Sequence, residues 1–490
     1  MLDFNRRPMS TCAWTTLLLF GLSAAVSAGD WPRFRGPNGD GIAPDDKAPP
    51  VEFSATKNLK WKLELPGPGL SCPIVVGDRV YLTCWSGYAT PQVQNGRFED
   101  LKRHLVCIDR KTGKFIWDKA VSAVLPEDPY RGMFAENGYA SHTPVSDGER
   151  IYAFFGKTGV VAFDLDGKEL WQVGVGTDSD QRGWGTASSP ILYKNLVIVT
   201  ASIEDHALVA LNKLTGERVW KSPADGFGST WGTPILVDLP DGRTDLVIGV
   251  PGEIWAFYPD TGKLRWYCEA LGTNSMCSSV VAHDGIIYAV EAGGGGSGGG
   301  TVAVRAGGKG DVTKTNIVWS GSDKGRIGTP IVYDGHMYWI SNRVANCVNI
   351  VNGKRVFQSR LKGNADPEPE ATAEQRPPGG RRGGPGGGGP GFGGPGGGGR
   401  GGPGGGGRGG PGGGGGGQDY ASPVAAHGKL FSVSRSGEIY VMQLGSDYKV
   451  LSVNRVSPES DEFFNSTPAI SNGDLFIRSN TTLYCVGSDS

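Results

Sequence analysis

The chain has few of the residues that mark a metalloprotein or a haem protein. Its 490 residues include only 8 cysteines and 6 histidines. No Cys-x-x-Cys occurs, so the sequence gives no support for a zinc ribbon or a haem attachment site. No pair at metal-ligand spacing is found among the single histidines His142, His206, His283, His336 and His427. No metal-binding residue is predicted.

The chain also lacks an excess of charge of either sign, and beyond residue 28 it has no long apolar run. A formal net charge of −1 gives no reason to expect a nucleic-acid partner. At the start, Arg6 and Arg7 precede the apolar stretch 17–26, which is short for a membrane span. Small residues follow, ending at Ala28. Residues 1–28 are therefore interpreted as a signal peptide for export to the periplasm or outside the cell, with a membrane anchor as the alternative.

A repeated block runs along nearly the whole chain. Each block opens with proline, in most cases after Thr or Ser, and continues through apolar runs separated by turns. Most spacings between blocks are 44 to 50 residues, a period typical of stacked supersecondary units, and two longer spacings contain insertions. The opening prolines are Pro73, Pro144, Pro190, Pro234, Pro330, Pro423 and Pro468, and Ser279-Val280 holds the same place in a block without proline.

One block, residues 187–220, shows what the repeat predicts. It contains four short apolar segments, and the one at 196–200 has the β-branched composition of a buried strand. Four antiparallel strands in about 45 residues are typical of one blade of a β-propeller. A turn glycine and a tryptophan recur at one spacing, and the tryptophan is expected to be buried on the outer strand against the next blade. These pairs are Gly113/Trp117, Gly167/Trp171, Gly216/Trp220 and Gly262/Trp266.

The final block, 465–487, contains only three strands, and the missing one is expected at the other end of the chain. Residues 58–63 form an apolar segment with Trp61 but no preceding blade. Pairing this segment with the last block would close the ring and protect its edges. The sequence therefore predicts an all-β, eight-bladed β-propeller of four-stranded antiparallel blades over residues 58–490, after an N-terminal extension at 29–57.

These repeats resemble the quinoprotein-type (PQQ-like) repeats, which are named after pyrroloquinoline quinone. The resemblance covers residues 58–487 and includes the form Asp-x-x-Thr-Gly-x-x-x-Trp at Asp109, Thr112, Gly113 and Trp117. One branch of that superfamily, the quinoprotein dehydrogenases, implies PQQ with Ca²⁺ as cofactor. The other branch, the BamB-like propellers of the outer membrane, implies no cofactor and a protein partner.

Two further features leave alternatives open. Cys72 and Cys84 are expected to lie nearly opposite each other in a hairpin, where they could form a disulfide or could be small buried residues. Residues 363–418 form an insert rich in Gly, Pro and Arg, with 29 glycines among the 39 residues of 379–417. This composition cannot bury a core and predicts disorder. The insert is either a flexible, weakly anion-binding arm or a tolerated surface expansion.

The approaches to the innermost strands are where a propeller would bind a ligand. Trp184 and Trp231 could stack on a planar ligand, and Arg182 and Arg326 could hold its carboxylates by paired hydrogen bonds. These four residues are candidate cofactor-binding residues for PQQ, and the alternative is that they plug the channel. The approaches are 139–142, 181–184, 229–231, 274–276, 324–326, 418–420 and 464–466.

No catalytic residue is predicted. The chain has no adjacent cysteine pair and no carboxylate–Asn cluster of the kind that the quinoprotein dehydrogenases imply. The sequence favours a non-catalytic exported scaffold that binds another envelope protein, similar to BamB-like proteins. The alternatives are a PQQ-dependent oxidoreductase with Ca²⁺, and a carbohydrate-related accessory protein of the envelope.

Overall fold

The structure is a computed structural model that describes residues 29–488, apart from 45–46, 94–95, 131–135, 137, 181–182, 293–297, 364–418 and 459–461. Residues on both sides of 362–417 build one compact unit. The predicted signal peptide and nearly all of the predicted insert lie outside the described residues. Among the described residues, no helix is long and apolar enough to cross a bilayer.

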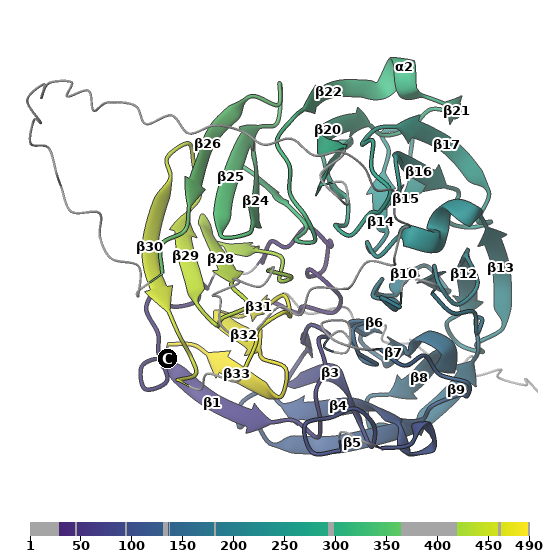
Figure 1. The fold of residues 1–490 in the computed structure, drawn as a ribbon, viewed down its shortest axis with the longest axis vertical. Coiled ribbons are helices and arrows are strands. Elements are labelled where there is room, and N and C mark those ends of the chain that lie inside the picture. Colours follow the sequence, from purple (N-terminus) through teal and green to yellow (C-terminus); the bar gives the residue numbers. More distant parts are fainter. Residues whose placement is uncertain are drawn as a thin grey trace, which may run out of the picture. The chain divides into compact units, whose positions relative to one another are not determined.

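Eight sheets formed by the described residues surround a central axis (Figure 1). Each contains an antiparallel blade of four strands, and one sheet has a fifth strand, so the predicted eight-bladed propeller is confirmed. From the innermost strand outward, the first four blades are β2 (Ile74–Val76), β3 (Arg79–Ser86), β4 (Lys102–Asp109), β5 (Phe115–Ser122); β6 (Val145–Ser146), β7 (Arg150–Phe154), β8 (Val160–Asp164), β9 (Glu169–Val173); β10 (Ile191–Tyr193), β11 (Leu196–Ala201), β12 (Ala207–Asn212), β13 (Arg218–Pro223); and β14 (Ile235–Asp238), β15 (Thr244–Val250), β16 (Glu253–Phe257), β17 (Leu264–Glu269).

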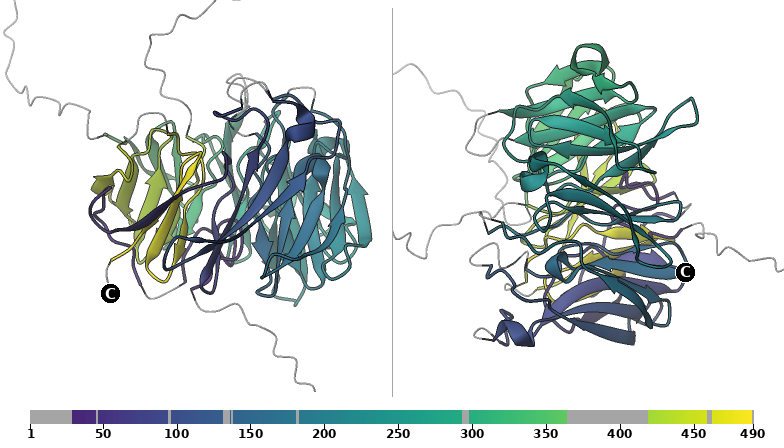
Figure 2. Two further views of the ribbon diagram at one scale, coloured as in Figure 1. Left: turned by 90° about the horizontal axis from the view of Figure 1, so that it is seen from below. Right: turned by 90° about the vertical axis from the view of Figure 1, so that its right-hand side faces the viewer.

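The other four blades continue in chain order around the ring. They are β18 (Val281–His283), β19 (Ile286–Ala292), β20 (Gly299–Arg305), β22 (Ile317–Gly321); β23 (Ile331–Tyr333), β24 (His336–Ser341), β25 (Val344–Asn349), β26 (Arg355–Arg360); β27 (Val424–Ala426), β28 (Lys429–Val433), β29 (Ile439–Gln443), β30 (Lys449–Asn454); and β31 (Ala469–Ser471), β32 (Asp474–Arg478), β33 (Thr482–Val486), β1 (Leu59–Glu64). Short turns of helix join some strands: η1 (Phe98–Asp100), η2 (Gly156–Thr158), η3 (Asp225–Ser229) and α2 (Thr313–Asn316). Side views show the blades standing next to one another (Figure 2).

The ring closes as the three-stranded last block predicted. β1 pairs antiparallel with β33, with Trp61 opposite Cys485 and Leu63 opposite Leu483. The last blade thus takes its outer strand from the beginning of the propeller. Trp61 also reaches the first blade, because its indole Nε1 donates to the Arg110 carbonyl at 2.8 Å.

The repeated tryptophan and glycine meet across the interface between neighbouring blades. A Cβ placed on Gly262 would lie 2.4 Å from the ring of Trp220 in the preceding blade, so only glycine leaves room for the indole. The φ of +66° at Gly262 also suits glycine. The same contact recurs in the pairs Trp61/Gly113, Trp117/Gly167, Trp171/Gly216 and Trp319/Gly353. Trp220 is buried as predicted, whereas Trp117 and Trp171 are half-buried on the outer strands.

The fourth blade uses a different contact at this position. Trp266 is fully buried and donates from Nε1 to Asp245 Oδ2 at 2.8 Å, while Arg265 pairs with the other oxygen of that carboxylate. In the fifth blade the connection between β20 and β22 contains a short extra strand, β21 (Gly310–Asp311), which pairs in parallel with β17 beside Trp266. This extra strand covers the edge of the fourth blade, as exposed sheet edges often require.

The core lies between the blades. The middle strands are buried on both faces, and every residue of β11 is buried. The outer strands alternate instead, as the pattern of β13 shows, because one face packs on the next blade and the other meets solvent. Sheets buried on both faces explain the continuous β-branched runs in the middle of each repeat.

The N-terminal extension packs into the propeller instead of preceding it as a separate segment. Trp31 is fully buried and exchanges backbone hydrogen bonds with Val75 in the first blade. The Arg35 guanidinium donates to the carbonyls of Thr329, Pro330 and Pro423. Ala43 and Gly41 then pair with Ala425 of β27. The segment 31–43 therefore lies across the inner strands of several blades.

Candidate functional site

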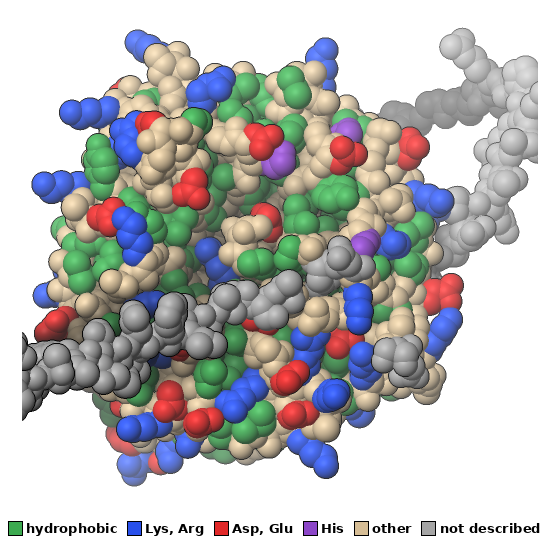
Figure 3. Space-filling model, turned by 180° about the vertical axis from the view of Figure 1, so that it is seen from behind, with side chains coloured by type: hydrophobic (Ala, Val, Ile, Leu, Met, Phe, Trp, Pro, Cys, Tyr) green, Lys and Arg blue, Asp and Glu red, His purple; other side chains and the backbone are tan. Residues whose placement is uncertain are grey.

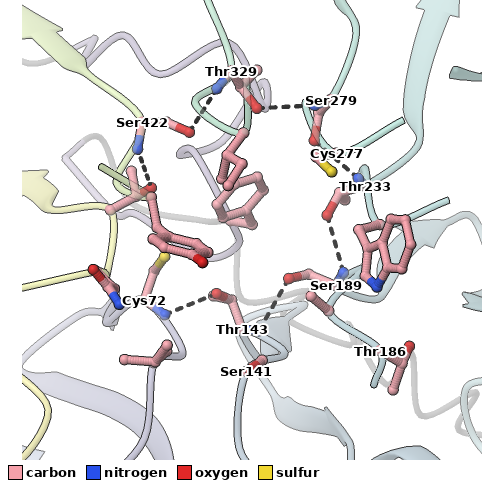
Figure 4. A pocket seen from close by; sticks show the side chains of 18 of the residues that line it. Cys72, Ser141, Thr143, Thr186, Ser189, Thr233, Cys277, Ser279, Thr329 and Ser422 are labelled. Atoms are coloured by element: carbon pink, nitrogen blue, oxygen red, sulfur yellow. Dashed lines mark hydrogen bonds between the residues drawn. The ribbon is translucent and has the colours of Figure 1, made fainter. Parts of the chain in front are cut away.

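A closed ring of hydrogen bonds lies around the channel, and it explains the Ser or Thr that precedes proline in most repeats. In seven of the eight blades, the residue at this position donates its backbone N–H to the side-chain oxygen of the equivalent residue in the next blade, at 2.9–3.0 Å (Figure 4). These residues, called the hydroxyl ring, are Thr143, Ser189, Thr233, Ser279, Thr329, Ser422 and Thr467.

Cys72 holds the eighth position of the ring. Its N–H donates to Thr143, and the backbone N–H of Thr467 bonds to its thiol. Burial raises the pKa of the Cys72 thiol, so the thiol stays protonated. Cys72 and Cys84 are both buried and form no disulfide with each other, which agrees with the small-buried-residue reading.

The hydroxyl ring surrounds a cavity of about 350 Å³ on the propeller axis. Phe34 of the N-terminal segment contributes to the cavity wall, so the extension that packs along the inner strands also limits this cavity. The remaining walls are largely apolar and include Leu70 and Ile327. The described chain therefore encloses a hollow with polar groups on the ring and apolar walls.

Three of the four predicted site residues line this cavity: Trp184, Trp231 and Arg326. The fourth, Arg182, lies outside the described residues. The two indole rings lie 5.1 Å apart and are tilted by 34°. They contact each other and leave no slot for a ligand between them. Trp231 Nε1 donates to the Gly185 carbonyl at 2.7 Å, which fixes the ring orientation.

Asn465, Tyr420 and the hydroxyl ring also line the cavity. Asn465 and Tyr420 lie in approaches that the sequence pointed to, but nothing in the repeat singled them out. Asn465 is 6% exposed, and neither its Oδ1 nor its Nδ2 has a hydrogen-bond partner among the described residues. A buried amide with both groups unpartnered is costly unless a ligand or water satisfies it.

The described lining of the cavity contains one charged side chain. None of its described lining side chains is a carboxylate, a histidine or a lysine, and its one arginine is Arg326. Arg326 forms no ion pair with a described residue, and its buried Nε has no hydrogen-bond partner there. Arg435, by contrast, pairs with Glu136 at 2.6 Å. Burial raises the pKa of the Tyr420 hydroxyl, which therefore stays protonated and neutral.

A second group of charged residues is buried behind the cavity wall. Thr186 belongs to both sites, since it lines the cavity and bonds through its hydroxyl to His142 Nε2 at 3.3 Å. Two ion pairs, Arg103–Glu127 and Lys157–Asp128, neutralise most of the charge. Burial lowers the pKa of His142 to about 3, so the imidazole is neutral. No described group of three or more His, Cys, Asp or Glu side chains could hold a metal ion.

Glu204 is a buried carboxyl in this group that has no ion-pair partner among the described residues. It is 2% exposed, and its Oε2 has no hydrogen-bond partner among the described residues. Burial raises the pKa of Glu204 to about 7, and the nearby Glu127 charge adds to the shift. Arg103, Lys157, Asp128, Asp178, Tyr130 and His142 also surround this small space.

Replacing Glu204 with Gln is expected to stabilise the protein above pH 7. The unfolded chain loses this proton near pH 4.5, and the folded protein loses it near pH 7. The wild-type free energy of unfolding should therefore fall as the pH rises through that window, by about 3 kcal/mol at most. E204Q removes this loss, because the amide does not ionise. Urea unfolding of both proteins at pH 5 and pH 8 measures the effect; equal differences at both pH values would contradict it.

Comparisons with known proteins agree with the propeller fold. The family model described as "Outer membrane protein assembly factor BamB" matches residues 97–230 and 204–331, just under half of the chain. BamB from Moraxella catarrhalis has 10% sequence identity and a TM-score of 0.54, covering 88% of this chain and 97% of that chain. Comparison with curated protein sequences gave no significant match.

Two quinohemoprotein alcohol dehydrogenases share the fold to a similar degree. The enzyme from Comamonas testosteroni has 11% identity and a TM-score of 0.54, covering 96% of this chain and 82% of that chain. The enzyme from Pseudomonas putida HK5 has 10% identity and a TM-score of 0.52, covering 95% and 81%. Identities this low establish the fold alone. The chain is an eight-bladed β-propeller with PQQ-type repeats, similar in sequence over residues 97–331 to the BamB family and in fold to both BamB and the quinohemoprotein dehydrogenases.

Proposed function

We propose that this protein is a non-catalytic scaffold of the cell envelope that binds another protein. The observation that carries the proposal is the lining of the central cavity. Its described residues carry hydroxyls, two thiols, an amide, aromatic and aliphatic groups and one guanidinium, without a carboxylate or imidazole to take up or deliver a proton. Such a lining can bind a ligand, but it holds no group with the properties of a general base.

The outer strands offer a surface for a protein partner. At the position just before the repeated aromatic residue, five of them expose an apolar side chain: Ile116, Leu170, Val219, Val318 and Val356, called the rim residues. Val219 is 50% exposed. Apolar side chains on the solvent face of edge strands favour contact with another chain. The face opposite to that of Figure 1 shows hydrophobic side chains interspersed with charges of both signs (Figure 3).

The fold likeness to BamB and the predicted signal peptide support an exported location. BamB is described as an outer membrane protein assembly factor, and this chain covers 97% of the length of the Moraxella protein. We accordingly propose a partner protein of the envelope. A protein with this function needs neither a cofactor nor a nucleic acid.

A quinone-dependent oxidoreductase is the second candidate, because Trp184, Trp231 and Arg326 do line one cavity. The residues present fit that cofactor poorly. Ca²⁺ prefers several oxygen ligands that include carboxylates, and the described lining has none. One arginine would face a tricarboxylated quinone, and the two indoles contact each other. We derive no catalytic step from this cavity.

A photo-reactive amino acid placed at the rim tests the scaffold proposal. Introduced at Val219 or Val318 and irradiated in intact cells, it should give a covalent adduct with one envelope protein of defined mass. The control position is Leu208, which is fully buried in β12 and should give no such adduct. If the protein is exported and folded in these cells but no rim position gives an adduct, the proposal of a partner bound at the rim is contradicted.

A further inference from the structure

The hydroxyl ring carries more hydrogen-bonding capacity than the ring itself uses. Each of its seven hydroxyl oxygens accepts one backbone N–H. A hydroxyl also has one O–H to donate. The hydroxyls of Thr143 and Thr467 donate to the Cys72 thiol, and the other five donate to no described residue. All seven line the cavity. Five O–H donors around the cavity thus lack an acceptor in the described protein.

Two other lining residues add to this donor set. The Nδ2 of Asn465 and the Nε of Arg326 are buried and unpartnered. Burial raises the pKa of the nearby Glu291 carboxyl, and the Arg326 charge acts against that rise. Arg326 and Tyr420 both line the cavity. Burial raises the pKa of Tyr420, the Glu136 charge adds to this rise, and the Arg435 and Arg326 charges act against it. A cation and neutral donors that converge on one space without a carboxylate in its described lining are complementary to an anion.

The walls determine what kind of anion fits. Phe34, Trp184, Trp231 and Tyr420 present aromatic surface, and Leu70 and Ile327 are aliphatic. A volume of about 350 Å³ exceeds what an inorganic ion needs and lies at the small end of ligand pockets. An anion with a flat apolar body would cover these walls while its charged end meets the donors.

From this geometry we infer that the central cavity binds a small aromatic carboxylate, with its carboxylate held by Arg326, Asn465 and the hydroxyl ring. The ligand is bound and not transformed, since the described lining supplies no base. Binding of this ligand goes beyond the scaffold function and does not depend on it. The cross-linking experiment tests the protein partner, and the titration below tests the ligand. Either proposal can therefore fail while the other holds.

Benzoate is the probe, and benzamide is its neutral counterpart of nearly equal shape. Calorimetric titration of the full chain, with tryptophan fluorescence as a second readout, should show benzoate binding at least about tenfold tighter than benzamide, because the charge-assisted hydrogen bonds are lost with the amide. R326Q should weaken benzoate binding by about tenfold or more and leave benzamide unchanged. N465D, which places a carboxylate among the donors, should abolish benzoate binding.

The matched control is R243Q. Arg243 is an exposed arginine paired with Asp241 in the fourth blade, outside the cavity, so its loss should leave benzoate affinity unchanged. Melting curves establish that each variant is folded, and R326K should recover part of the affinity. Equal binding of benzoate and benzamide, or benzoate binding that R326Q and N465D leave intact, would overturn the inference. Catalytic turnover with bound PQQ would also overturn it, since the cavity would then be a quinone site.

Discussion

Replacing Trp266 with alanine is expected to lower the free energy of unfolding by about 3–5 kcal/mol, the usual cost of truncating a buried aromatic side chain. Trp266 is fully buried, and its indole donates a hydrogen bond to Asp245 Oδ2. Its removal leaves a cavity and also leaves a buried carboxylate oxygen without that donor. Urea denaturation followed by circular dichroism measures the change.

Trp266→Phe and Trp171→Ala are the matched controls. Trp266→Phe retains most of the ring volume but cannot donate to Asp245, so it isolates the cost of the hydrogen bond. Trp171 occupies the same repeat position but is half-buried, and its indole bonds to the Lys213 carbonyl at 3.2 Å. W171A should therefore cost less than W266A. A cost of about 1 kcal/mol or less for W266A would contradict its assigned place between the blades.

Removal of β1 is expected to have the second large effect. A chain that begins at residue 65 lacks the outer strand of the last blade and leaves β33 with an unpaired edge. It also loses the Trp61 indole against Gly113 and the Lys60–Asp474 ion pair at 2.6 Å. We expect a loss above about 5 kcal/mol, more than almost any single substitution causes, or the absence of a cooperative unfolding transition.

A chain that begins at residue 58 is the control for this truncation. It retains β1 but lacks Trp31 and Arg35, so it should be less stable than the chain that begins at residue 29 and more stable than the chain that begins at 65. Thermal and urea unfolding of the three proteins give the order directly. Equal midpoints for the chains that begin at 58 and at 65 would show that β1 does not close the ring.

The blades were predictable because each repeated residue has a local physical reason to recur. Gly262 and its equivalents must be glycine where the preceding tryptophan packs, and the apolar runs must be continuous where strands are buried on both faces. Ring closure followed from counting strands, since an unpaired edge at 465–487 required a partner and residues 58–64 were the one apolar segment without a blade.

The path of the N-terminal segment could not be predicted in the same way. Arg35 is buried with its guanidinium donating to three backbone carbonyls. Every residue has such a carbonyl, so the sequence does not indicate which ones an arginine will contact. The cavity was predicted in part. Trp184, Trp231 and Arg326 stood in the approaches to the inner strands, whereas the hydroxyl ring was visible only as Ser or Thr before proline. Its role becomes evident once the eight positions lie next to one another around the axis.

The measurement that tests the non-catalytic account most directly is a turnover assay of the purified protein after incubation with pyrroloquinoline quinone and Ca²⁺. With alcohols or sugars as substrates and an artificial electron acceptor, the account predicts no reduction of the acceptor above the rate of quinone and Ca²⁺ alone. Quinone-dependent turnover by the protein, lost in R326Q but retained in R243Q, would contradict it and would identify the cavity as an active site.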